Sequence, residues 1–165
     1  MALDLHTPIS FRMLFILFQI GRDRYALSAG VIIEVLPLIN LKRVPGAPVG
    51  VAGILNYHGT PVPVIDLNEM TLAEPAAQRL STRIILVKYP LQAQNPHPLG
   101  LIAERATSMI RRSAQDFVET GVESENAPYL GRVVTDAGGL IQWIEVERLL
   151  TPELRDVLFR ELVSS

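Results

Sequence analysis

The side chains that could do chemistry are few and lie far apart in the sequence. The three histidines are His6, His58 and His97, and there is no cysteine, whereas a zinc site needs three or four converging ligands. Asp66 and Glu69 could share a proton, but their i, i+3 spacing is better explained by the start and cap of a short helical turn. No G-x-S-x-G, P-loop or G-x-G-x-x-G motif occurs. The sequence therefore predicts no catalysis, no metal site and no cofactor.

The amino-acid composition limits which partners and which cellular compartment are plausible for this protein. The 165 residues include 15 basic and 17 acidic side chains, and the resulting net charge of −2 makes nucleic acid a poor partner. The longest apolar run, Met13 to Phe18, is shorter than the roughly 20 residues of a membrane span or the roughly 7–15 of a secretory signal. We expect a buried strand there, with no membrane insertion. The lack of cysteine fits a cytoplasmic protein.

Strand patterns dominate the chain. Eight β-branched, aromatic or otherwise apolar runs are separated by turn residues, which predicts a barrel or a sandwich. These runs cover residues 14–20, 25–27, 31–35, 62–65, 83–89, 99–102, 131–135 and 140–144. Pro61 and Pro63 frame the fourth run, and because proline cannot donate to a strand ladder, this strand belongs at an edge or a barrel rim.

One long helix is predicted at the C-terminal end, over residues 152–163. Thr151 supplies an N-cap and Pro152 a first-turn proline. Four apolar residues between Leu154 and Leu162 recur on one face of this helix. We expect it to pack on the barrels, and the alternative is a docking helix for a partner.

The chain also repeats itself weakly. Residues 59–70 can be laid over residues 138–149, since both contain a glycine turn, an apolar strand, one acid and a helical turn. The alternative is that short strands resemble one another by chance. We interpret the repeat as two similar small β-barrels that share one hydrophobic seam. They form a single domain over residues 1–165, with approximate halves 12–75 and 83–150.

The most distinctive segment covers residues 53–67 and is typical of strand, tight turn, strand and helix cap. Asn56 and Gly59 bracket Tyr57 and His58, so these two side chains are predicted to be presented at the turn. A tyrosine and a histidine without a catalytic partner suit a binding surface. The alternative is an ordinary hairpin whose residues serve only the turn.

Here the sequence resembles the CheW-like adaptors of bacterial chemosensory arrays. The matching motifs follow the family order over roughly residues 12 to 150: Tyr25-Ala26-Leu27, Ile32-Ile33-Glu34-Val35, Val44-Pro45, the segment 53–67, Ile84 to Val87, Gly100-Leu101-Ile102, Tyr129-Leu130-Gly131 and residues 140–150. Three positions depart from the family pattern: His58 stands for the usual arginine, Tyr57 for the usual leucine, and Glu104, within Ala103-Glu104-Arg105-Ala106, for the usual acid of a Val-Asp-x-Val segment.

The resemblance implies a mainly β fold of two small SH3-like five-stranded β-barrels. It also implies a non-catalytic adaptor that couples methyl-accepting chemoreceptor tips to the regulatory domain of a CheA-type histidine kinase. Such a protein lies in the cytoplasm and reaches membrane-associated receptor arrays through its partners. Two rival functions remain open: a ligand-binding or enzymatic barrel, which needs a pocket with convergent polar groups, and a nucleic-acid-binding barrel.

The same resemblance predicts which residues bind partners. They are Ile32, Glu34 and Val35 on one strand, and Asn56, Tyr57, His58 and Gly59 at the turn. An Arg to His change replaces a permanent charge with a titratable one, so we hypothesise that His58 sets specificity for a particular receptor and kinase pair. The Tyr-His-Gly turn is similar to that of adaptors in surface-sensing pathways, which makes surface sensing an alternative output to swimming.

Overall fold

The structure is a computed structural model and describes residues 11–92 and 95–160. Its elements are β1 (Arg12–Ile20), β2 (Asp23–Ser28), η1 (Ala29–Val31), β3 (Ile32–Pro37), β4 (Val51–Tyr57), β5 (Thr60–Asp66), α1 (Leu67–Leu72), β6 (Arg83–Gln92), β7 (Asn95–Ser113), η2 (Ala114–Asp116), β8 (Leu130–Asp136), β9 (Gly139–Ile144), η3 (Val146–Arg148) and α2 (Pro152–Leu158). The predicted mainly β fold with a C-terminal helix is confirmed. Among the described residues, no helix is long and apolar enough to span a bilayer.

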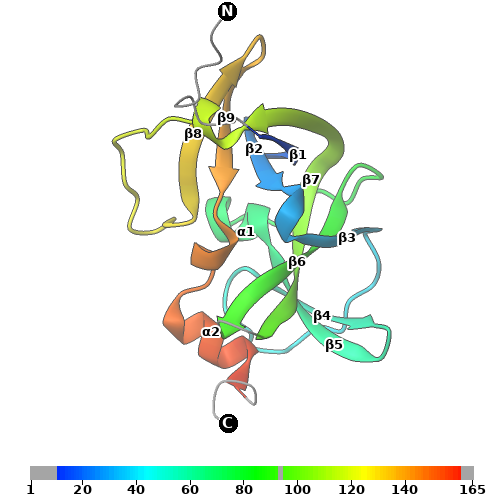
Figure 1. The fold of residues 1–165 in the computed structure, drawn as a ribbon. Coiled ribbons are helices and arrows are strands. Elements are labelled where there is room, and N and C mark those ends of the chain that lie inside the picture. The colour runs from blue at the N-terminus through cyan, green and yellow to red at the C-terminus, as the bar shows by residue number, and fades with distance from the viewer. Residues whose placement is uncertain (1–10, 93–94, 161–165) are drawn as a thin grey trace, which may run out of the picture.

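The strands form two groups that share the long strand β7 (Figure 1). In the first group, β4 pairs with β5, β5 runs parallel to the first part of β7, and that part pairs with β6, which pairs with β3. In the second group, β8 pairs with β9, β9 runs parallel to β2, β2 pairs with β1, and β1 pairs with the second part of β7. The two groups have the same pattern of neighbours, as two similar small barrels would have.

The first group is built from one continuous stretch, residues 32–103, whereas the second group takes strands from both ends of the sequence. The β1–β2 hairpin joins β8 and β9, whereas β3 crosses over after η1 to pair with β6. Strand β7 has 19 residues, which is long enough to serve both groups. Its pairing with β1 shifts register between Leu17 and Gln19, close to Arg105, which has a φ of 52°. The two groups are therefore tied together by the shared strand β7 and by the chain that crosses from β2 to β3.

Burial on both faces of the central strands explains this architecture. In β6, Ile85 and Val87 face a large apolar cluster between the two groups, while Ile84 and Leu86 face a smaller cluster inside the first group. A third cluster, centred on Phe15, lies inside the second group. Because side chains alternate along a strand, a continuous apolar run fills two clusters at once. The large cluster is the shared hydrophobic seam expected from the sequence.

The segment between β3 and β4 runs beside β4. Lys42 and Ile54 exchange backbone hydrogen bonds, with N···O distances of 2.9 and 2.8 Å. This approach requires Gly53, whose φ is 150°, because a Cβ atom there would lie 2.5 Å from the Lys42 carbonyl oxygen. In the second group, Val118 and Val133 exchange an equivalent pair of bonds.

Helix α2 packs its apolar side on the seam. The Thr151 hydroxyl accepts a hydrogen bond from the Leu154 N–H at 3.1 Å, as expected of an N-cap. Leu154 and Leu158 contact the seam cluster, and Phe159 belongs to it. Helical geometry ends at Leu158, because Phe159 leaves it with a φ of −125°. The last predicted helical residues, 161–163, lie outside the described part of the chain.

Candidate functional site

The β4–β5 turn presents two side chains in a fixed geometry. His58 and Gly59 have φ values of 51° and 87°, the two positive values that a tight two-residue hairpin of type I′ requires. The Asn56 side-chain oxygen accepts a hydrogen bond from the Gly59 N–H at 2.9 Å, which holds the turn closed. Tyr57 pairs with Thr60 across the turn. The predicted tight turn is present and exposes His58, whereas Tyr57 is half-buried and packs against the apolar cluster inside the first group.

The fold brings Glu34 of β3 to this turn, although 23 residues separate it from Tyr57. The Tyr57 hydroxyl donates a hydrogen bond to the Glu34 carboxylate at 2.5 Å. This bond raises the pKa of Tyr57, because loss of the phenol proton would remove the donor and place two negative charges together. The Tyr57 and His58 rings lie 4.4 Å apart, centroid to centroid. Glu34, Tyr57 and His58 thus form one contiguous surface, called here the Glu34 face.

Strand β3 divides its side chains between this face and the core. Its register shifts between Ile32 and Glu34, and the extra residue, Ile33, is 38% exposed beside Glu34. Ile32 and Val35 are half-buried and pack against the seam cluster. Of the predicted site residues on β3, Glu34 is therefore the one that is fully presented. Ile33 was not singled out from the sequence, because regular alternation assigns it to the inner face and only the bulge turns it outward.

The acidic residues that were considered for chemistry have structural roles in the fold. Asp66 is 5% exposed and caps α1, accepting hydrogen bonds from the N–H groups of Asn68, Glu69 and Ala76. Burial raises the pKa of Asp66, and the three N–H donors oppose that shift. Glu104 accepts a hydrogen bond from the Ala77 N–H and so anchors the loop after α1. The assignment of the Asp66 and Glu69 pair to a helix start is confirmed.

Metal binding finds no support in the part of the chain that is described. No cluster of three or more histidine, cysteine, aspartate or glutamate side chains occurs there. His58 packs against Tyr57 with the ring planes tilted by 60°, and His97 packs against Phe159 with ring centroids 5.0 Å apart. His6 lies outside the described residues. The Glu34 face offers a carboxylate from β3 and two rings from the β4–β5 turn, and this combination suits contact with another protein.

Comparison with known proteins gives one consistent result. The family model of the CheW-like domain matches residues 14–153. The chain is 30% identical over 118 residues to "Chemotaxis protein CheW" of Helicobacter pylori, covering 70% of this chain and 68% of that protein. It is 24% identical over 140 residues to "Chemotaxis protein CheW" of Bacillus subtilis, covering 84% and 86% of the two chains.

The fold comparison agrees. The crystal structure of the scaffolding protein TtCheW from Thermoanaerobacter tengcongensis superposes with a TM-score of 0.74 at 20% sequence identity. The aligned part covers 93% of this chain and 96% of that one, so the likeness extends over both strand groups. With the family model matched over most of its length and the same fold from end to end, the chain belongs to the CheW-like domain family.

Proposed function

We propose that the protein is a non-catalytic adaptor of chemotaxis signalling that couples methyl-accepting chemoreceptor tips to the regulatory domain of a CheA-type histidine kinase. Family membership supports the adaptor role. The observation that carries the choice of surface is the hydrogen bond between Tyr57 and Glu34, which joins two predicted partner-binding segments into one face. We further propose that the protein acts in the cytoplasm and is held at receptor arrays only through its partners.

The Glu34 face is preorganised for binding, because its backbone conformation is fixed within the protein itself. The type I′ turn and the Asn56 contact fix the backbone before a partner arrives, so little entropy is lost on binding. Tyr57 holds the Glu34 carboxylate through one oxygen and leaves the other available to a cation on the partner. Such a charge adds specificity and a faster encounter more than raw affinity.

His58 is proposed to select the partner pair. It lies at the tip of the hairpin, is exposed and packs against Tyr57 in a tilted ring contact, so its ring contributes to the same surface. A neutral or singly charged imidazole cannot replace the bidentate guanidinium usual at this family position. The replacement of arginine by His58 favours a role in a chemosensory array that does not control swimming, such as one for surface sensing.

The test is binding of the purified full chain to the regulatory domain of a chemosensory kinase from the same cell. We expect a Kd near the micromolar range for the wild type. Glu34→Lys should abolish binding, because it reverses the charge of the face. Tyr57→Phe removes only the hydroxyl and should weaken binding roughly two- to tenfold. The matched control is Glu74→Lys, which makes the same charge change at an exposed residue in the loop after α1.

Two outcomes would contradict the proposal. One is the absence of binding to any chemosensory kinase by a folded protein. The other is equal loss of binding in Glu34→Lys and Glu74→Lys, since this would show a general charge effect and no specific face. For His58, receptor and kinase affinities that are unchanged in both His58→Ala and His58→Arg would remove its selective role.

A further inference from the structure

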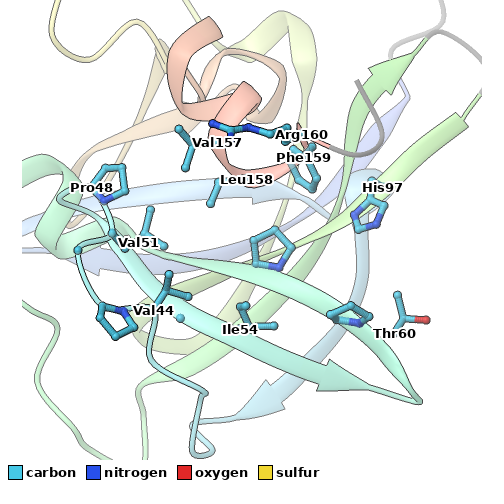
Figure 2. A pocket seen from close by; sticks show the side chains of 16 residues that line it. Val44, Pro48, Val51, Ile54, Thr60, His97, Val157, Leu158, Phe159 and Arg160 are labelled. Atoms are coloured by element: carbon cyan, nitrogen blue, oxygen red, sulfur yellow. The ribbon is translucent and has the colours of Figure 1, made fainter. Parts of the chain in front are cut away.

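A groove of about 540 Å³ lies between α2 and the β4–β5 hairpin (Figure 2), and neither Glu34 nor Tyr57 lines it. Val157 and Leu158 form one wall, and Val44, Val51 and Ile54 line the other. Val44 and Val157 are 41% and 50% exposed, so both walls present apolar surface to solvent. The volume of the groove is large enough to hold several apolar side chains of a ligand.

The walls of the groove offer few backbone donors. Four of the lining residues, Pro45, Pro48, Pro61 and Pro63, have no N–H group. Among the other lining residues, the N–H groups of Ala47, Val51, Ile54 and Phe159 already donate to carbonyls of the chain. An extended peptide, which binds by adding a strand, would find little to pair with here. A helix satisfies its own backbone groups and needs only apolar contact.

The charges of the groove have one sign. None of its lining residues is an aspartate or a glutamate, and Arg160 and His97 are the residues there that can carry positive charge. Lys42 and Arg43 immediately precede Val44 and are exposed. A ligand that brings carboxylates next to its apolar side chains would complement this rim, because guanidinium binds carboxylate with two parallel hydrogen bonds.

We propose that this groove binds an amphipathic helix of a partner protein, with leucine-like side chains between α2 and β4 and carboxylates beside Arg160. The proposal does not depend on the function of the Glu34 face. The groove adjoins that face through Thr60, the first residue of β5, so a partner held by the hairpin turn could extend a helix into it.

The test uses 13C-methyl NMR of the full chain with synthetic helical peptides of about 14 residues. One peptide carries leucines on one face flanked by glutamates, a second replaces the glutamates by lysines, and a third has a helix-breaking proline at its centre. We expect the glutamate peptide to shift the methyl signals of Val44, Ile54 and Val157 saturably. The lysine peptide should bind roughly tenfold more weakly. Arg160→Glu should reverse this preference, whereas Arg79→Glu, at an exposed cation in another loop, should not.

Each other result overturns the proposal. Equal affinity for both charged peptides means that charge is not read, and equal affinity for the proline peptide means that the occupant is not helical. A rise in molecular mass that Val157→Glu abolishes identifies a second copy as the occupant. Peptide binding that appears only after deletion of residues 161–165 identifies the chain's own end. The Glu34→Lys variant must bind the peptide normally, which separates this test from that of the proposed function.

Discussion

Arg24 and Asp136 show how one ion pair fastens a hairpin to its neighbour. The guanidinium makes two hydrogen bonds to the Asp136 carboxylate and a third, of 3.0 Å, to the Gly139 carbonyl. The Gly138 N–H also donates to the same carboxylate at 2.7 Å. These donors lower the pKa of Asp136 to about 2. The pair joins β2 to the turn between β8 and β9, at the edge of the second strand group.

This ion pair predicts a pH-dependent stability. A carboxyl with a lowered folded-state pKa stabilises the fold above its unfolded pKa of 3.8, and the contribution is lost as pH falls from there through about 2. Solvent screening limits the contribution to about 1 kcal/mol at neutral pH. Asp136→Asn should therefore lose about this much in urea unfolding at pH 7 and match the wild type near pH 2.

Asp156→Asn provides the control for that measurement, because Asp156 is an exposed acid on α2. It should change the unfolding free energy little at either pH. An Asp136→Asn deficit that persists unchanged at low pH would show that the substitution acts through the turn geometry and not through the charge.

At the scale of elements, β6 is the strand on which both apolar clusters depend. Ile84, Ile85, Leu86 and Val87 are all fully buried. Consecutive residues cannot share a face, so two of these side chains fill the seam and two fill the interior of the first group. The strand pairs with β3 on one edge and with β7 on the other, and so it is also covered along both edges.

This position predicts that two neighbouring substitutions cost similar free energies for different reasons. Ile85→Ala opens a cavity in the seam and Leu86→Ala opens one inside the first group, and each should destabilise by about 2–5 kcal/mol. Leu80→Ala is the control, since Leu80 is 99% exposed and its truncation should be within about 0.5 kcal/mol of neutral. Chemical denaturation measures all three. A small effect at either buried position would mean that its cluster can collapse around the gap.

At the scale of the whole molecule, the shared strand β7 and the seam cluster make the two groups dependent on each other. The seam cluster includes β1 and β2 from one group and β5, β6 and β7 from the other. Strand β7 contributes hydrogen bonds to both groups. We propose that the chain folds as a single domain, because neither group can lose its core without exposing the seam.

The corresponding prediction is one cooperative unfolding transition. Trp143, the single tryptophan, reports on the second group through its fluorescence, and the amide signals of Leu55 and Val64 report on the first by NMR. Their urea midpoints should coincide in the wild type and should shift together in Leu86→Ala, although Leu86 lies in the first group. Separate midpoints for the two groups would show two folding units and contradict the single domain.

Several features could be predicted from the sequence because their causes are local. The apolar runs at residues 14–20 and 83–89 lie within β1 and β6, and the Thr151-Pro152 pair starts α2. The Asn56 to Gly59 turn has the residue types that positive φ values demand. Each of these rules acts over a few residues, so the tertiary structure is not needed to apply it. The CheW-like motifs follow from the same local patterns.

Only the tertiary structure decided which strands are neighbours and what surfaces they make. The contact of Glu34 with Tyr57, the outward turn of Ile33 and the groove beside α2 all join segments that are distant in the sequence. Strand pairing depends on which apolar cluster each face of a strand fills. The sequence of a strand that is apolar on both faces therefore does not identify its neighbouring strands. The sequence alone therefore determined most of the elements, their turns and the family. It did not predict that β7 continues to Ser113, and the long-range burial of the seam fixed the faces available to partners.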